Sequence, residues 1–466
     1  MDGYQLADFE DVELSVALTA DLDRQLAAHF AKGVAQEDLT FAYWHPSRGA
    51  TRYTAVLQRL ALPGEDERLL QGNVAFTAEY ILRVLDELPS GSGIALLHSH
   101  LGPGWQSMSH DDVVAERDRL AGIVASTTDL PLVGLTWATD GTWSARLWFR
   151  TGRHQYERRW ATTVRSVGRR LRLSFQPELH PAPKPSAAQV ATLSVWGEQA
   201  QQDLARTHVG IVGLGSVGSI VAEALSRTGI AHLTLIDHDV LEERNLDRTL
   251  GAYRDDVEQG LTKVATARRL VERSHTSDSF RVSAIEQSLL TPEGLRGALD
   301  CDVIICCVDR PWPRHVMNAL AYAHLIPIID GGILARVNDA GKLLHVDWRI
   351  HTVGPERACL YCLEALRRSD AALDRDGMLD DPDYVKGLSQ ADRERYQRRN
   401  VFAFSLSVAA HEVLQLVALV TGNHRVGGIG PQTYHAYPGT MEVAEQARCT
   451  EECDIAALTG TAGLIV

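Results

Sequence analysis

The chain has 466 residues, which at roughly 150 residues per domain predicts two or three domains. Hydrophobic residues make up 45% of it and charged residues 23%, a balance that is typical of packed domains and excludes a disordered chain. The net charge of −14 offers little counterion release at a phosphate backbone, so we expect no nucleic-acid partner.

The sequence also argues against export and against a membrane. The first 20 residues contain no Lys or Arg, so the basic start of a secretory signal is missing. The longest apolar stretch, 401–420, contains Glu412 near its middle, which predicts a buried helix and no membrane partner. Seven cysteines, an odd number, favour metal or core roles over disulfides. We therefore expect a cytoplasmic protein.

Residues 1–175 mix helix and strand patterns without regular alternation. Apolar spacing predicts helices at 20–31, 77–88 and 111–123. It predicts strands at 39–44, 52–61, 94–97, 132–137 and 142–149, the last two joined by an Asp140-Gly141 turn. This irregular order predicts an N-terminal α+β domain over 1–175.

A proline-rich linker, 176–190, follows and begins QPELHPAPKPSA, which predicts an extended spacer at a domain boundary. Beyond it, strand and helix patterns alternate, which predicts an α/β domain over 191–466 with a mainly parallel sheet. The strands are expected at 208–212, 232–237, 303–308 and 327–330, and the helices at 218–228, 261–273 and 313–324. The charged stretch 367–400 predicts a mobile loop with some helix.

The densest chemical motif of the first domain is His98-Ser99-His100, followed by Ser109 and Asp112. Two histidines at i and i+2 on a strand point to one face. A carboxylate at the next helix start could complete a three-ligand Zn²⁺ site, with a fourth position left for water, as in hydrolytic zinc sites. The alternative is that Ser109 and Asp112 are ordinary helix-capping residues that need no metal.

This segment resembles the JAB/MPN (JAMM) metallo-isopeptidases over most of residues 15–150. The resemblance implies zinc ligation by His98, His100 and Asp112, an oxyanion donor in Ser109 and a catalytic base in Glu37. Here a Leu follows the second histidine where the family usually has Pro. The gap before Ser109 is one residue longer, so Asp111 is an alternative ligand. For Glu37 the alternative is a solvated surface carboxylate.

The second domain carries a glycine-rich loop, Gly213-Leu-Gly215-Ser-Val-Gly218, directly after a predicted strand. Such a loop lets a phosphate approach a helix N-terminus. Asp237 lies 19 residues after Gly218, at the end of the next strand, where it can reach a ribose hydroxyl. Taken alone, this pattern fits an NAD enzyme equally well.

The residues that follow resemble the ThiF/MoeB-type adenylyltransferases, relatives of ubiquitin-activating enzymes, over about 195–450. The motifs are Asp237-His-Asp239, Asn245-Leu-Asp-Arg248, Gly260-Leu-Thr-Lys263 and Val308-Asp309. The resemblance implies a Rossmann-like fold that binds ATP and Mg²⁺. In it Asp237 would hold the ribose, with Asp239 nearby, and Asp309 would bind Mg²⁺. The phosphate contacts would come from Asn245, Arg248 and Lys263.

Four cysteines form two close pairs, Cys359/Cys362 and Cys449/Cys453, which fits a structural Zn²⁺ site. The family has the same paired arrangement, usually with CxxC as the second pair, where this chain has CxxxC. We expect the remaining cysteines in the core: Cys301, Cys306 and Cys307. Residues 363–448 contain no Cys, so we predict adenylation without a thioester in the crossover loop. Residues 174–205 contain no Arg, although many relatives have one there, which would weaken activity unless another cation serves.

Together these features predict a bifunctional enzyme. One half would adenylate the C-terminal Gly of a ubiquitin-like protein, and the other would process or remove that protein by zinc-dependent hydrolysis. The expected partners are that carrier, a conjugating enzyme and a second copy of the chain. One alternative is activation of a sulfur-carrier protein for thiocarboxylate formation. Another is an ATP-binding scaffold with an inactive activation site.

Overall fold

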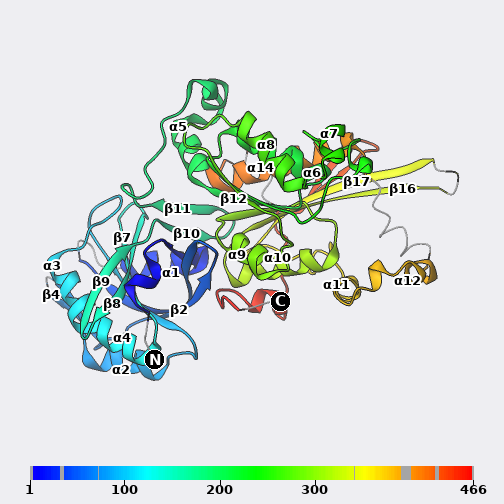
Figure 1. Ribbon diagram of the computed structural model, residues 1–466. Helices are drawn as coiled ribbons and strands as arrows, with labels where there is room; N and C mark the ends of the chain where they lie inside the picture. The colour runs from blue at the N-terminus through cyan, green and yellow to red at the C-terminus, as the bar shows by residue number, and fades with distance from the viewer. Residues whose placement is uncertain are drawn as a thin grey trace.

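The computed structural model describes residues 4–31, 36–71, 73–338, 340, 342–389, 400–423, 425 and 430–463. Within these residues the chain forms two large sheets, each with its own helices, and the two lie side by side (Figure 1). A third, two-stranded sheet joins β4 (Arg68–Gln71) to β5 (Asn73–Phe76).

The N-terminal sheet has nine strands in the order β11-β10-β1-β3-β2-β6-β7-β8-β9. It is mixed, because β1 runs parallel to β3 and β10, and β6 runs parallel to β7. Its strands are β1 (Glu13–Thr19), β2 (Leu39–Arg48), β3 (Arg52–Ala61), β6 (Gly93–Ser99), β7 (Leu132–Trp137), β8 (Trp143–Gly152), β9 (Gln155–Trp160), β10 (Thr163–Val167) and β11 (Leu171–Phe175). The accompanying helices are η1 (Leu6–Phe9), α1 (Ala20–Phe30), α2 (Ala78–Asp86), α3 (His110–Val113), η2 (Val114–Leu120) and α4 (Ala121–Thr128).

Local sequence signals explain where several of these elements begin. The Thr19 hydroxyl accepts the N–H of Leu22 at 3.1 Å, so β1 ends where α1 starts. The helix expected at 111–123 is in fact three segments, α3, η2 and α4, and η2 is π-helical. A π-segment widens the turn and often marks a functional site. Here it carries Glu116, which is fully buried.

The C-terminal sheet has eight strands in the order β14-β13-β12-β15-β16-β17-β18-β19. The pairs from β14 to β16 are parallel, as predicted, and those from β16 to β19 are antiparallel. The strands are β12 (His208–Val212), β13 (His232–Ile236), β14 (Arg281–Ile285), β15 (Val303–Cys306), β16 (Ile328–Val337), β17 (Leu343–Val353), β18 (Gln432–His435) and β19 (Thr440–Val443).

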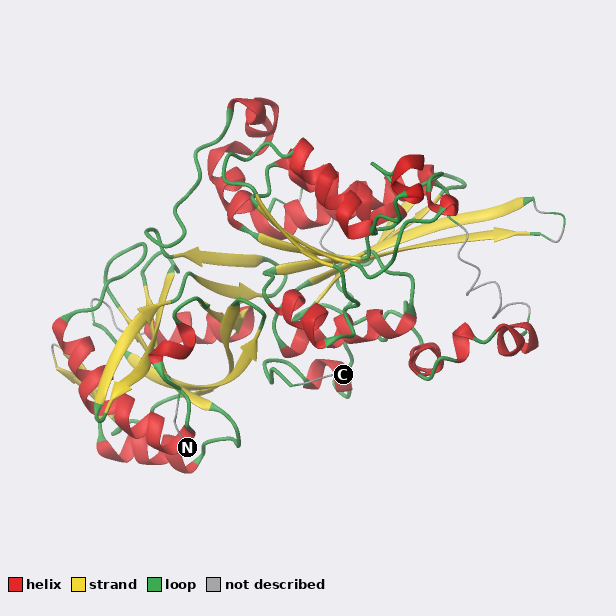
Figure 2. Ribbon diagram, in the orientation of Figure 1, coloured by secondary structure: helices red, strands yellow, loops and turns green. Residues whose placement is uncertain are grey.

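Helices cover both faces of this sheet (Figure 2). One face packs against α6 (Ser216–Thr228), α8 (Lys263–Ser274) and α14 (Phe402–Thr421), and the other against α9 (Pro292–Leu299) and α10 (Pro311–Ala323). The remaining segments are η3 (Ala187–Gln189), α5 (Val190–Arg206), η4 (Glu243–Asn245), α7 (Arg254–Glu258), α11 (Arg368–Arg375), η5 (Met378–Asp380), α12 (Pro382–Gly387) and α15 (Asp454–Ala457).

The apolar stretch near residue 410 forms α14, as predicted. By length and composition alone α14 could span a membrane. Its buried side chains, among them Val408, Leu416 and Val417, instead pack in the same core as α6 and β12. The strand predicted at 327–330 is much longer in the structure, because β16 continues to Val337 and pairs with β17 as a hairpin. The charged stretch after residue 367 contains α11, η5 and α12, and its residues 390–399 lie outside the described residues.

The two halves are packed together, which the linker did not predict. Residues 176–186 have no helix or strand, as expected of a spacer. However, Ala17, Val56 and Val167 of the N-terminal sheet share one buried cluster with β12 and α14 of the second half. The proline-rich linker therefore connects two halves that share a core.

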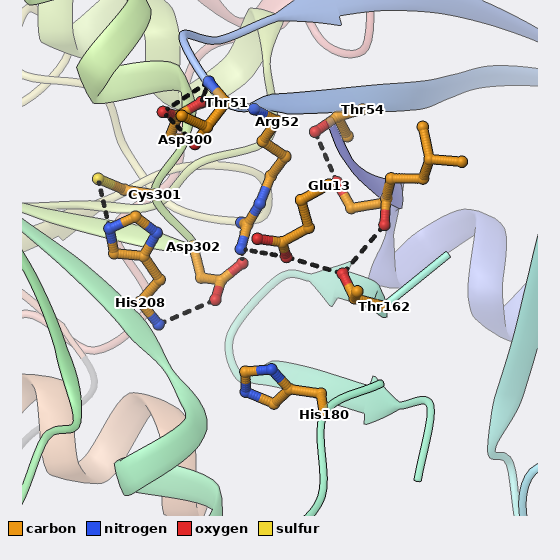
Figure 3. Close-up of polar contacts among 12 residues, drawn as sticks. Glu13, Thr51, Arg52, Thr54, Thr162, His180, His208, Asp300, Cys301 and Asp302 are labelled. Carbon is orange, nitrogen blue, oxygen red and sulfur yellow. Dashed lines mark hydrogen bonds and ion pairs between the residues drawn. The ribbon is translucent and has the colours of Figure 1, made fainter. Parts of the chain in front are cut away.

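A buried ion pair crosses the same interface (Figure 3). Arg52 at the start of β3 donates to Asp302 before β15, with 2.7 Å between Nη1 and Oδ1. The Arg52 side chain is 3% exposed and that of Asp302 1%. Asp300 accepts the backbone N–H groups of Thr51 and Arg52 at 3.1 and 2.9 Å. Burial alone would raise the pKa of Asp302, but the charges of Arg52 and Arg165 lower it overall.

We predict that Asp302→Ala lowers the free energy of unfolding by about 3–5 kcal/mol, because it leaves the buried Arg52 guanidinium without its closest carboxylate. The matched control is Asp376→Ala, since Asp376 pairs with Arg375 at 2.9 Å while both side chains are more than half exposed. That change should cost less than about 1 kcal/mol. Urea unfolding followed by tryptophan fluorescence gives both values. Equal losses would contradict the role of Asp302.

Candidate functional sites

The structure brings His98, His100 and Asp112 together at the end of β6. Their ligand atoms all lie within 4.8 Å of one another. Asp112 places Oδ1 3.4 Å from His98 Nε2 and Oδ2 3.3 Å from His100 Nε2. The two imidazole Nε2 atoms are 3.3 Å apart. Two imidazoles and a carboxylate that converge in this way fit the ligand set of a hydrolytic Zn²⁺ site. Asp112, rather than Asp111, takes part in this cluster.

Ser109 caps α3 and thereby fixes Asp112. The Ser109 hydroxyl accepts the Asp112 N–H at 3.2 Å, while Asp112 Oδ2 accepts the Ser109 N–H at 2.7 Å. The capping interpretation of these residues is therefore confirmed, and it is compatible with the metal interpretation because the same carboxylate faces both imidazoles. Hydrogen bonding to Asp112 raises the pKa of His100.

Glu37 lies beside the same cluster. After the hydrogen bond and the charge of Asp112, the negative charge of Glu37 also raises the pKa of His100. The neighbouring residue Asp38 pairs with Ser99, since the Asp38 carbonyl accepts the Ser99 N–H at 3.0 Å and Ser99 Oγ accepts the Asp38 N–H at 3.0 Å. These bonds hold the segment of Glu37 against the strand end that carries the two histidines.

A buried polar network supports His98, and the sequence interpretation missed it. Thr136 Oγ1 on β7 lies 3.2 Å from His98 Nε2 and accepts from Arg146 Nη1 at 2.5 Å. Glu116 on η2 in turn accepts from Arg146 Nε at 2.9 Å. A side chain on Gly134 would clash with Glu116, so glycine is required there. The available signal was Arg146 within the otherwise apolar run 145–149 of β8.

In the second half, the glycine loop connects β12 to α6. Gly213 has φ +88°, and a Cβ there would lie 2.8 Å from the Cys307 carbonyl oxygen. A Cβ on Gly218 would lie 1.9 Å from the Gly213 carbonyl oxygen, whereas one on Gly215 would meet nothing within 4 Å. The loop therefore turns tightly and leaves space at Gly215 at the start of a helix, the geometry that receives a phosphate.

This loop lies at a switch point of the sheet. β12 has β13 on one side and β15 on the other, and all three run parallel. Open α/β sheets bind ligands at the carboxyl ends of strands at such a point. Asp237 follows β13, Asp309 follows β15, and the loop follows β12. The fold therefore gathers the three motifs at one edge.

The charged residues at this edge have partners within the chain. Asp237 Oδ2 accepts the Leu214 N–H at 2.6 Å and Oδ1 accepts the Asp239 N–H at 2.9 Å, so its carboxylate braces the glycine loop. Lys263 Nζ lies 2.6 Å from Asp239 Oδ2. These bonds place an acid and a base directly beside the loop.

The remaining predicted nucleotide residues lie on neighbouring segments. Asn245 Oδ1 accepts the Glu242 N–H at 2.9 Å and so caps η4. Arg248 pairs with Asp247 at 2.7 Å. Asp309 is exposed. Its charge interacts electrostatically with that of Arg314. Arg314 in turn donates two hydrogen bonds, of 2.9 and 2.8 Å, to the buried Asp330.

The four paired cysteines also converge, with their Sγ atoms all within 4.8 Å of one another. Cys359 Sγ lies 3.7 Å from Cys453 Sγ, and Cys449 Sγ accepts the Cys359 N–H at 3.1 Å. A hydrogen bond from Cys359 lowers the pKa of Cys449. Four converging thiols fit a closed structural Zn²⁺ site. Of the other cysteines, Cys301 and Cys306 are buried in the core, as predicted, whereas Cys307 is only partly buried against it.

Comparison with known proteins identifies the second half. Residues 186–455 match the model of the ThiF family, and the chain belongs to that family. The match does not extend to the N-terminal half.

Several curated relatives cover part of the chain. A tRNA threonylcarbamoyladenosine dehydratase of Escherichia coli (strain K12) is 32% identical over 143 residues, 30% of this chain and 52% of the relative. A sulfur carrier protein ThiS adenylyltransferase of Bacillus subtilis (strain 168) is 29% identical over 184 residues, 39% and 52% of the two chains. A crystal structure of E. coli MccB with MccA-N7isoASN has a TM-score of 0.44 and 17% identity, covering 58% of this chain and 74% of that one. The chain spans about half the length of the curated relatives it matches.

We predict that Cys449→Ser binds one zinc ion fewer per chain than the unaltered protein and melts at a lower temperature, because three thiolates hold the ion less tightly and the C-terminal segment loses its anchor. Glu451→Gln, an exposed neighbour, is the matched control and should change neither value. Metal analysis and thermal denaturation measure both. Unchanged zinc content in Cys449→Ser would contradict the assignment.

Proposed function

We propose that the C-terminal half uses ATP and Mg²⁺ to adenylate the terminal carboxylate of a ubiquitin-like or sulfur-carrier protein. The observation that carries the proposal is the glycine loop at the switch point, with an acid after each neighbouring strand. Relatives named as ubiquitin-like modifier-activating enzyme 5 and ThiS adenylyltransferase support the substrate class.

The residues have separable roles in this reaction. The backbone N–H groups of residues 215–218, at the N-terminus of α6, bind phosphates, and Lys263 and Arg248 balance their charge. Asp237 orients the ribose, and Asn245 contributes a phosphate contact. Mg²⁺, when bound through Asp309, would supply further neutralisation of the phosphates.

The bond changes follow from this arrangement. An oxygen of the carrier's terminal carboxylate attacks the α-phosphorus of ATP. The bond from that phosphorus to its bridging oxygen breaks, and pyrophosphate leaves. Lys263 and Arg248 each pair with an aspartate in the structure, so each must share its charge with the phosphates during this step.

We propose that the N-terminal half is a zinc-dependent peptidase of the JAMM type acting on the same carrier. His98, His100 and Asp112 would hold the ion, which when bound would activate a water for attack on a carbonyl. Glu37 accepts the proton of the attacking water. The Ser109 hydroxyl turns from its cap to stabilise the oxyanion. The convergence of the three ligands and the position of Glu37 support this assignment.

Direct transfer of the activated carrier to a separate thiol is part of the proposal, because residues 363–448 contain no cysteine. That thiol would belong to a conjugating enzyme or to a sulfur donor, and the ThiS relative favours the sulfur route. We further propose a cytoplasmic homodimer. Exposed Leu406 and Leu414, eight residues apart on α14, support such a contact.

We predict that Asp309→Ala abolishes ATP–pyrophosphate exchange driven by a small Gly-terminated carrier, with a loss of about 10²-fold or more, because charge on the phosphates is left unbalanced. His100→Ala should leave the exchange intact and should abolish cleavage of a carrier that bears a C-terminal peptide extension. Asp309→Ala should in turn retain that cleavage. Equal loss of exchange in both variants would contradict the division of labour.

A further inference from the structure

A third cluster of metal-ligating side chains lies on the antiparallel extension of the C-terminal sheet. It consists of His345 and Asp347 on β17 and His435 on β18, whose ligand atoms lie within 4.8 Å of one another. His345 Nε2 is 2.6 Å from Asp347 Oδ2, and His435 Nδ1 is 2.9 Å from Asp347 Oδ1. Glu442 on β19 lies close by, with Oε2 3.6 Å from His435 Nε2.

The strand register explains this convergence. His345 and Asp347 are two residues apart, so both side chains leave β17 on one face. Asp347 is the direct partner of His435, and Glu442 is the partner of Thr433, two residues before His435. Cross-strand and diagonal neighbours on one face are within reach of each other's side chains. Three donors from two strands therefore meet on this face, and Glu442 lies against the other ring nitrogen of His435.

The opposite face of the same strands is held firmly. Trp348 stacks on Tyr434 with ring centroids 4.4 Å apart, and Trp348 also stacks on Phe404 of α14. Trp348 is 7% exposed. The backbone that carries the three donors is thus fixed by an aromatic contact beneath it, which pre-organises the cluster.

Charge also favours a cation at this place. In the described part of the chain, the ion pairs formed by Asp347 are with His345 and His435. Arg349, two residues further on the same face, is engaged with Asp330 at 2.9 Å. Two carboxylates thus face two imidazoles, and Arg349 has its own partner, while Arg336, the cross-strand partner of His345 on β16, is exposed to solvent.

We propose that His345, Asp347 and His435 bind a divalent transition-metal ion, and that Glu442 orients His435 through its other ring nitrogen. Two imidazoles with carboxylates suit Zn²⁺, Co²⁺ and Ni²⁺ better than Ca²⁺ or Mg²⁺, which prefer oxygen ligands. The site is independent of the proposed adenylation and hydrolysis, because it uses none of their residues.

The position of this cluster suggests what the ion does. β18 and β19 begin the C-terminal segment that continues to Cys449 and Cys453. An ion that ties β17 to β18 would fasten the start of this segment, while the four cysteines fasten its later part. The competing explanation is a protonated His435 that pairs with Asp347 and Glu442 without any metal.

The test uses the full chain, with zinc added to chelator-treated protein and followed by calorimetry and thermal denaturation. We expect His345→Gln and Asp347→Asn each to lose one zinc-binding event per chain, or to weaken it at least tenfold. Both should also lose the part of the zinc-dependent rise in Tm that this site supplies. Glu442→Gln should weaken the event less, since Glu442 contacts His435 from outside the set of three ligands.

His154→Asn, which removes an exposed histidine elsewhere, is the control and should bind zinc like the unaltered chain. If His345→Gln and Asp347→Asn bind the same number of zinc ions with the same affinities as this control, the proposal is wrong and the protonated cluster is the correct explanation. The variants and the control share the other two proposed zinc sites. A negative result at this cluster therefore does not count against zinc binding at those two sites.

Discussion

The contact between Arg52 and Asp302 is the constraint on which the arrangement of the two halves depends. Both side chains are almost fully buried, and a charge in that environment is tolerated only with a close opposite charge. Because Asp302 immediately precedes β15 and Arg52 begins β3, the pair locks one sheet against the other (Figure 3). The shared apolar cluster around Val56 then extends the contact. The helices beside the two proposed sites, α3 and α6, lie on either side of this interface (Figure 1).

This packing changes how the fusion should be understood. A flexible spacer would let each half search for the carrier separately, with an effective concentration set by the length of the linker. Two halves that share a core instead hold the proposed peptidase and adenylation sites in one orientation. A carrier released from one site must therefore reposition its tail to engage the other.

Much of this structure could be predicted from the sequence where the signal is local. The alternation of apolar residues over 52–61 matches β3 at both ends, and the glycine loop follows β12 as its spacing predicted. Residues that depend on distant partners could not be found in this way. Arg146 and Glu116 are 30 residues apart and meet only through the sheet. His435 is 88 residues from Asp347, and only the pairing of β17 with β18 joins them. The sequence predicts Asp237 at the end of the second strand, but its bond to the Leu214 N–H depends on how the loop folds and could not be predicted.

A structure of the full chain with ATP and Mg²⁺ bound tests the central claim most directly, because the claim concerns where the phosphates lie. The account predicts phosphates against the backbone N–H groups of residues 215–218, the ribose at Asp237, and Lys263 turned from Asp239 toward the nucleotide. A nucleotide bound elsewhere, or a loop that stays closed with no cationic side chain facing the phosphates, would contradict it.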